Sequence, residues 1–210
     1  MRFRGMMLAI TLAMTLLAGT ANAEYRTHDG LFVRVGLGGG YAMDTAEDDS
    51  NSALGTAKYT ADGGAGAFHV QAGFALNKNL IVHASLWDWV IVGPDLTIEV
   101  DGKEVTGSST DDIKFFMIAF GGGVTYYTDS NAFLTINAGV ADLTIKDGDD
   151  EIGKSKTGMA INVTGGKEWW IGEEFALGGG AFFGYSMIPD DGDYIWNGIA
   201  VGALITATFN

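Results

Sequence analysis

The sequence has no cysteine, so no disulfide framework can stabilise it. It has only two prolines in 210 residues, and beyond the first 23 residues no stretch reaches the roughly twenty apolar residues that a membrane helix needs. Yet 47% of the residues are hydrophobic and 32 are glycine. A chain this apolar must cover its apolar surface with a geometry other than a membrane helix. In lipid the other available geometry is a closed β-barrel.

The first 23 residues have the features of a cleaved secretory signal. Arg2 and Arg4 precede an apolar run over residues 6–18, and Ala21-Asn22-Ala23 supplies the small-residue cleavage site. The apolar run is too short for a membrane anchor helix. We therefore expect residues 1–23 to be removed. No cysteine follows to serve as a lipoprotein anchor.

Basic residues are scarce in the remainder, residues 24–210, which we expect to form one domain. The whole chain has 12 lysines and arginines against 26 aspartates and glutamates. Removing the signal leaves about ten basic residues and a formal charge of about −16. Such a chain lacks the basic surface that contacts with phosphates require, which argues against nucleic acid as a partner.

Eight segments of about ten to fifteen residues alternate apolar with small or polar residues, and their connections are alternately long and short. Tight turns at one end and long loops at the other are typical of an up-and-down transmembrane barrel. The sequence therefore predicts an all-β protein, a closed antiparallel barrel of about eight strands. The segments are residues 31–43, 66–77, 80–92, 113–127, 132–145, 157–171, 175–188 and 197–210.

Period-2 alternation assigns each segment two faces. In the second segment Phe68, Val70 and Phe74 share one face, while His69 and Gln71 share the other. A soluble lipocalin-like barrel would turn the large residues inward. The second set is mostly Gly, Ala, Thr and Asn, a poor soluble surface but a suitable filling for a narrow lumen. The large apolar residues are therefore expected to face lipid.

Connection lengths and aromatic residues predict the orientation. The short turns at 77–79, 129–131 and 172–174 are expected to be periplasmic, and the acidic loops near 44–65, 93–112, 146–156 and 189–196 extracellular. Within the second loop, alternation around Asp101-Gly102 predicts a hairpin with a type I′ turn that extends strands three and four. Asp88 and Asp142 are interpreted as phase breaks near the outer interface, at bulges. Aromatic residues are expected to form two interfacial girdles. They are Tyr126, Tyr127, Trp169, Trp170, Phe175 and Phe209 near the turns, and Tyr41, Trp87, Trp89, Tyr185, Tyr194 and Trp196 near the loops.

With these strands, girdles and the terminal segment over residues 204–210, the chain resembles the small outer-membrane β-barrel superfamily, the group of the OmpA barrel, OmpX, OmpW and the opacity proteins. The resemblance implies a location in the bacterial outer membrane, with both termini periplasmic and the long loops extracellular. It implies outer-membrane lipid and lipopolysaccharide as surroundings, and a monomer. It also implies that the barrel-assembly machinery reads Phe209, although Asn210 follows it.

Four inward-phase side chains are candidates for a site in the lumen. Arg34 and Glu168 lie toward the turn end of their strands, and His69 and His83 share the inward face. One interpretation is a polar pathway or gate. The other, which we favour, is a plug, because charges in a narrow interior have to be paired.

The sequence His83-Ala84-Ser85 invites comparison with the outer-membrane lipid A deacylases, which use a His and a Ser two residues apart. A serine nucleophile needs an imidazole base and an orienting carboxylate. The motif of that family continues with Asn, however, whereas Leu86 follows here. Both residues also fall on the lumen face, while that chemistry requires the lipid face.

Acidic loops supply the last candidates, as oxygen ligands for a hard cation. The candidate ligands lie in two of the long loops and are Asp147, Asp149, Asp150, Asp190, Asp191 and Asp193. Neither of these two loops follows the twelve-residue EF-hand pattern, so a solvated, self-repelling loop is the default, and no cofactor is expected.

We expect a non-enzymatic protein with an envelope or surface-interaction role through these loops. The alternative is a narrow channel for small or apolar solutes, as in OmpW, and a more remote one is a lipid A-modifying enzyme.

Overall fold

The computed structural model describes residues 28–48, 57–100, 103–108, 112–190 and 194–210. The predicted signal peptide, residues 1–23, lies outside the described residues. Those residues form β1 (Leu31–Asp48), β2 (Ala57–Asn77), β3 (Leu80–Val92), β4 (Asp95–Val100), β5 (Lys103–Ser108), β6 (Ile113–Tyr127), β7 (Ala132–Asp147), β8 (Asp150–Lys154), β9 (Gly158–Trp170), β10 (Phe175–Pro189) and β11 (Ile195–Phe209).

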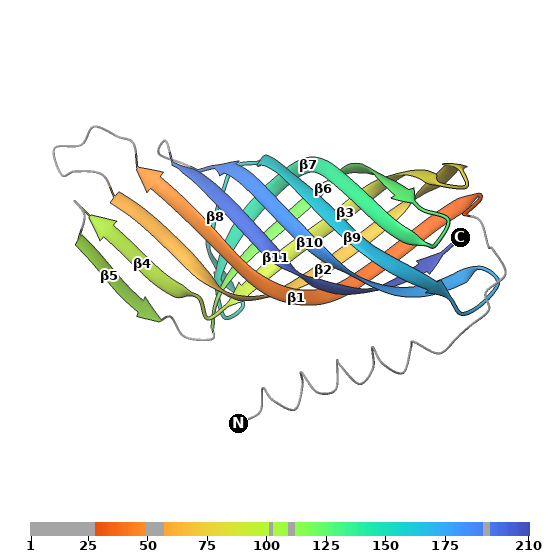
Figure 1. Ribbon diagram of the computed structural model, residues 1–210. Helices are drawn as coiled ribbons and strands as arrows, with labels where there is room; N and C mark the ends of the chain where they lie inside the picture. Colours follow the sequence, from red (N-terminus) through yellow and green to blue (C-terminus); the bar gives the residue numbers. More distant parts are fainter. Residues whose placement is uncertain (1–27, 49–56, 101–102, 109–111, 191–193) are drawn as a thin grey trace, which may run out of the picture.

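Eight of these strands close into an antiparallel barrel, which confirms the predicted fold (Figure 1). The wall runs β1-β11-β10-β9-β7-β6-β3-β2, and β2 pairs with β1 to close it. Every strand of the wall pairs with its sequence neighbour, so short turns collect at one end and long connections at the other. We call these the turn end and the loop end. Within the described residues no helix is long and apolar enough to cross a membrane, a finding that concerns helices alone.

The loop end contains more strand than the sequence predicts. β1 was expected to end at residue 43, but its pairing with β11 continues to Glu47. The predicted hairpin is confirmed as β4 and β5, and its turn, Asp101-Gly102, lies outside the described residues. β4 pairs with residues 57–62 of β2, above the level where β3 ends, and the hairpin projects beyond the barrel (Figure 1). The loop near 146–156 contains β8, which pairs with β7.

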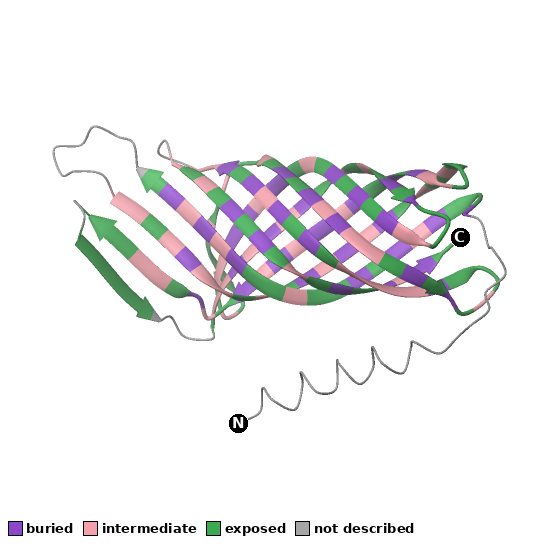
Figure 2. Ribbon diagram, viewed as in Figure 1, coloured by how far each residue is buried: buried purple, intermediate pink, exposed green. Residues whose placement is uncertain are grey.

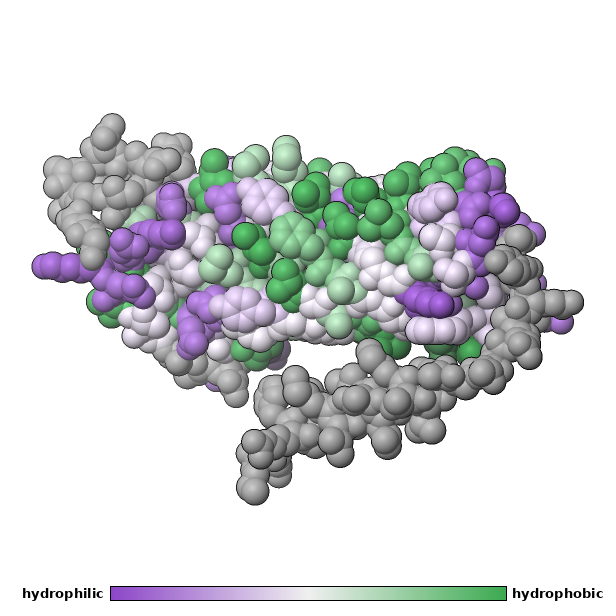
Figure 3. Space-filling view, viewed as in Figure 1, coloured by the Kyte–Doolittle hydropathy of each residue, from purple (hydrophilic) through white to green (hydrophobic). Residues whose placement is uncertain are grey.

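Burial follows the predicted faces along the barrel wall (Figure 2). His69 and Gln71 are buried in the lumen, whereas the apolar residues of the opposite phase face outward. On the visible face hydrophobic residues gather over the middle of the wall and hydrophilic ones toward its ends (Figure 3). The most exposed apolar side chains of the wall, 60–62% exposed, are Leu37, Phe74, Leu76, Phe120, Met159 and Ile205.

Part of the girdle assignment is wrong. Trp87, Trp89, Tyr127 and Trp170 are buried in the lumen, because they fall on the inward phase of their strands. Aromatic side chains that are exposed on the outer wall include Tyr41, Tyr126, Trp169, Phe175 and Phe209.

The predicted bulges at Asp88 and Asp142 are also wrong. Both residues pair in regular register with Ile118 between them, and the irregularity in β7 lies at Ile145 and Lys146. Asp88 is in phase with the outward residues of β3, since the tryptophans on either side of it point inward. Its carboxylate accepts a hydrogen bond from the backbone N–H of Phe68 at 3.0 Å.

Candidate functional site

The lumen has two layers of different chemistry. Toward the turn end it is lined by hydrogen-bonding side chains, among them Arg34, Glu168, Thr135 and Thr208. Toward the loop end it is filled by an apolar cluster from several strands, including Trp87, Trp89, Ile91, Met117 and Leu143. A water-filled diffusion pore would have polar walls throughout, so this filling argues against one.

Arg34 and Glu168 form the centre of the turn-end layer. Their side chains are almost fully buried, and Arg34 Nε lies 3.0 Å from Glu168 Oε1. Strand pairing places Arg34 between Gln71 on β2 and Thr208 on β11. The guanidinium donates to Gln71 at 3.3 Å and to Thr135 at 3.0 Å. The two charges that the sequence placed near the same end of the lumen therefore pair across it.

Hydroxyl groups complete the coordination of this ion pair. Tyr127 accepts a hydrogen bond from Arg34 and donates one to Glu168 Oε2 at 2.6 Å. Thr208 and Thr206 donate to Glu168 Oε1 at 2.8 Å and 3.2 Å. A buried ion pair offsets its desolvation cost only when its remaining donors and acceptors are satisfied, as they are here. The turn-end layer is therefore neutral and densely packed, which disfavours the passage of water or ions through it.

Aromatic rings enclose the same guanidinium. Arg34 Cζ lies 4.1 Å from the centroid of Phe133 and 5.2 Å from that of Phe32. These distances allow cation–π attraction. A cavity of about 10 Å³ lies between Arg34, His69 and Thr206, roughly the volume that one water molecule needs.

His83 and Ser85 are hydrogen-bonded but do not form a catalytic triad. His83 Nδ1 lies 2.8 Å from Ser85 Oγ, which donates to Asn137 at 2.8 Å. Because the serine proton points to Asn137, His83 Nδ1 must carry its own proton and cannot act as a base toward Ser85. The other ring nitrogen lies 3.0 Å from Thr125 Oγ1, where a triad would have a carboxylate.

His69, the fourth lumen candidate, takes part in neither group. Its ring packs edge-on against Phe182 at a centroid distance of 5.4 Å. Its Nε2 has no hydrogen-bond partner among the described residues. The structure brings Arg34 and Glu168 together, pairs His83 with Ser85, and leaves His69 beside the apolar layer.

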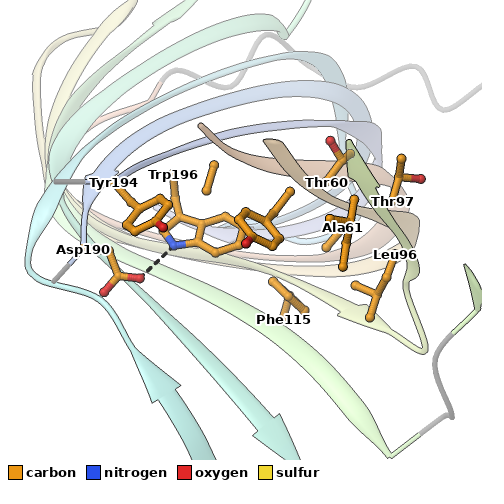
Figure 4. Close-up of a pocket in the computed structure, with 11 residues that line it drawn as sticks. Thr60, Ala61, Leu96, Thr97, Phe115, Asp190, Tyr194 and Trp196 are labelled. Carbon is orange, nitrogen blue, oxygen red and sulfur yellow. Dashed lines mark hydrogen bonds between the residues drawn. The ribbon is translucent and has the colours of Figure 1, made fainter. Parts of the chain in front are cut away.

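A cavity of about 360 Å³ opens at the loop end, and we call it the mouth pocket (Figure 4). Sequence reasoning missed it, because its lining comes from strands whose pairing above the predicted wall was not foreseen. Its walls are mainly apolar and aromatic, and its volume suits a small molecule. The lining residues are Ala46, Tyr59, Thr60, Ala61, Leu96, Thr97, Ile98, Phe115, Asp190, Tyr194 and Trp196.

The acidic candidates are not gathered. Asp147, Asp149 and Asp150 are exposed at the β7–β8 hairpin, while Asp190 lies at the mouth pocket and accepts a 2.9 Å hydrogen bond from Trp196 Nε1. Asp191 and Asp193 lie outside the described residues. Within the part of the chain that the structure describes, no three acidic, histidine or cysteine side chains are grouped to hold a metal ion.

Comparison with known proteins yields fold likenesses only. Neither a protein-family model nor a curated protein matches the sequence. Among solved structures, the chain is similar to the outer membrane protein OprG of Pseudomonas aeruginosa (15% identity, 89% of this chain and 98% of that chain, TM-score 0.47). It is also similar to Neisserial surface protein A (17%, 84% and 96%, 0.46) and to Ail, the attachment invasion locus protein of Yersinia pestis (13%, 85% and 99%, 0.40). Identities and scores this low indicate nothing about ligand or activity.

Proposed function

We propose that this chain is a bacterial outer-membrane β-barrel that is closed at its turn end and acts at its loop end, by binding a ligand in the mouth pocket. The turns are periplasmic and the loops extracellular in this proposal, and the barrel is a monomer embedded in lipid and lipopolysaccharide. The single observation that carries it is the contrast between the satisfied Arg34–Glu168 network and the open cavity at the opposite end.

The outward-facing apolar wall supports the membrane location, since exposed apolar surface of this extent needs lipid. Phe209 keeps its proposed role as the residue read by the barrel-assembly machinery. Its ring is exposed on the outer wall, and it pairs with Val33 and Phe175 at the turn end. We propose that Phe209→Ala lowers the amount of assembled barrel in cells, whereas Asn210→Ala does not.

Single-channel recording on the refolded protein in planar bilayers tests the closed lumen. We expect no steady conductance from the unaltered protein, because the charged layer is paired and packed. Thr125→Ala serves as the control variant, since it alters a lumen hydroxyl outside the direct contacts of the ion pair. Steady conductance that shifts on Arg34→Ala would overturn the closed-lumen proposal.

A second candidate function is a narrow pathway for apolar solutes. The observation that favours it is the apolar cluster in the lumen toward the loop end, which includes Trp87, Trp89 and Met117. This candidate would be favoured if cells that contain the protein take up an apolar solute and if Ala61→Phe, which enlarges a residue of the pocket wall, abolishes that uptake.

Catalysis has no comparable support. Unchanged lipid A in cells that overproduce the protein is the result expected for a non-enzyme.

A further inference from the structure

Four aromatic side chains stand around the mouth pocket in two perpendicular pairs. The rings of Phe115 and Trp196 meet at 64° with centroids 5.9 Å apart, and those of Tyr59 and Tyr194 meet at 66° with centroids 6.4 Å apart. They come from β6, β11, β2 and the β10–β11 connection, so they surround the space rather than stack within it. Aromatic faces on several sides of one cavity form the type of cage that attracts ammonium groups.

The one charged residue that lines the mouth pocket among the described residues is negative. Asp190 is part of the lining, and no lysine or arginine lines it among the described residues. Lys156 stands at the rim, where its ammonium donates to the backbone carbonyl of Asp190 at 3.2 Å. With about sixteen excess negative charges on the expected mature chain, the surrounding field favours the approach of cations over anions.

A buried carboxyl lies one layer below the pocket. Asp44 is on the same face of β1 as the pocket residue Ala46, two positions nearer the turn end, or about 7 Å along the strand. It is 1% exposed, and its Oδ2 has no hydrogen-bond partner in the part of the chain that is described. No basic side chain among those residues forms an ion pair with it.

Other buried polar groups surround Asp44. Ser186 Oγ has no hydrogen-bond partner in the described chain, and the indole of Trp89 faces the Asp44 carboxyl and interacts with it. A Cβ at Gly198 would lie 2.4 Å from both Asp44 Oδ1 and Ser186 Oγ and 3.0 Å from the Trp89 ring. These three side chains therefore meet over Gly198 and occupy the room that a larger side chain would need. An unsatisfied buried carboxyl is costly in a folded protein, and a positive charge in the pocket would offset that cost.

We propose that the mouth pocket binds an organic cation, a small molecule whose aromatic or apolar body lies among Tyr59, Phe115 and Trp196 and whose ammonium group is held by the aromatic faces and the charge of Asp44. This inference rests on the proposed function of the loop end and specifies the class of ligand. The cage provides shape and cation–π attraction, and Asp44 provides charge in surroundings where water screens it poorly.

The experiment compares three probes of similar size by isothermal titration calorimetry on the full barrel in lipid nanodiscs: benzyltrimethylammonium, benzyl alcohol and benzoate. We expect the cation to bind at least tenfold more tightly than the neutral probe, and benzoate more weakly than either. Asp44→Asn keeps the side-chain volume and should lower the affinity for the cation about tenfold, leaving that for benzyl alcohol unchanged.

Asp88→Asn is the matched control, because it removes a carboxylate from the outer wall and an amide oxygen can still accept from Phe68. Its binding should equal that of the unaltered protein. Tyr59→Leu is a second variant that keeps an apolar wall but removes a ring, and it should lower the cation affinity several-fold more than the neutral one.

Three results would overturn the inference: equal affinity for cation and alcohol, an Asp44→Asn variant with unchanged preference, or an equal loss in the Asp88→Asn control. Binding of benzyl alcohol without preference for the cation would leave the proposed mouth site standing. If none of the three probes binds, the inference and the proposed site both fail, whereas conductance through the lumen would overturn the proposed closed lumen alone.

Discussion

At the turn end of the lumen Arg34 and Glu168 lie 3.0 Å apart within a network of hydroxyl and amide groups, whereas at the loop end Asp44 is equally buried and has no positive partner among the described residues. Arg34, Glu168 and Asp44 are the three Asp, Glu, Lys or Arg side chains that are buried among the described residues. One end satisfies its charges internally, and the other leaves a charge unmatched.

This difference distinguishes a structural role of the turn end from a binding role of the loop end. A paired and fully hydrogen-bonded cluster needs nothing further, so its contribution is to structure and to closing the lumen. A buried group that breaks the rule of polar satisfaction is expected where function, not stability, selects the residue. The unmatched charge therefore points to the loop end as the part that acts.

The largest effect should follow from breaking the pair at the turn end. Arg34→Leu leaves Glu168 buried without its counter-charge, and we expect a loss of about 3–5 kcal/mol in the free energy of unfolding. Urea titration of the barrel folded in lipid vesicles, followed by tryptophan fluorescence, measures it.

The double variant Arg34→Leu, Glu168→Leu is the companion measurement. Removing both charges restores neutrality, so the double variant should lose much less free energy of unfolding than the two single variants lose together. Additive losses would show that the two side chains do not stabilise each other, and the contrast between the ends of the lumen would then disappear.

The opposite sign is expected at the loop end. Asp44→Asn replaces an unmatched carboxyl with a neutral group of the same size, and it should raise the free energy of unfolding by about 1–2 kcal/mol. The same urea titration measures the change, with Asp88→Asn as the control of unaltered stability. Destabilisation by Asp44→Asn would mean that the charge is satisfied in the folded barrel.

Much of the barrel is predictable from sequence, because a wall with lipid on one side and a filled lumen on the other imposes a strict period of two. Strand number, the short turns and the inward position of Arg34, His69, His83 and Glu168 follow from this alternation. The phase is harder to assign where both faces carry large residues. Trp87 and Trp89 were for that reason assigned to the girdle, although they point inward.

The mouth pocket could not be predicted, since alternation describes one strand and the pocket depends on pairing between distant ones. Tyr59 and Leu96 meet because β4 pairs with the upper part of β2. Asp44 was counted as a loop residue because β1 was expected to end at residue 43. Only the register with β11 reveals that strand and lumen continue past it.

A smaller effect is expected from the histidine and serine between the two layers. Ser85→Ala removes the hydrogen bonds to His83 and Asn137 and should cost about 1 kcal/mol. Lipid A from cells with the variant and with the unaltered protein should be identical by mass spectrometry. Any deacylated product that disappears with Ser85→Ala would contradict the assignment of these residues to the packing of the lumen.

The smallest effect concerns acid and is confined to the turn end. His28 precedes β1, stacks on Tyr127 at a centroid distance of 3.6 Å and is hydrogen-bonded to Asn210. Burial lowers the pKa of His28 from 6.5 to about 4, against the opposing charge of Glu168. Its neutral form is therefore the one that fits the folded protein.

The contribution of His28 to stability is complete above pH 6.5, where the residue is neutral in both states. As the pH falls toward 4, the unfolded chain takes up a proton that the folded one does not, so the stability declines. Between pH 7 and pH 6 this share should be less than about 1 kcal/mol. His28→Phe keeps a ring against Tyr127 without a titratable group, so the difference between its urea midpoints at the two pH values should be smaller than in the unaltered protein. If the urea midpoints of both proteins depend equally on pH, a group other than His28 causes the acid sensitivity. If the midpoint of the unaltered protein rises on acidification, the sign argued for His28 is wrong.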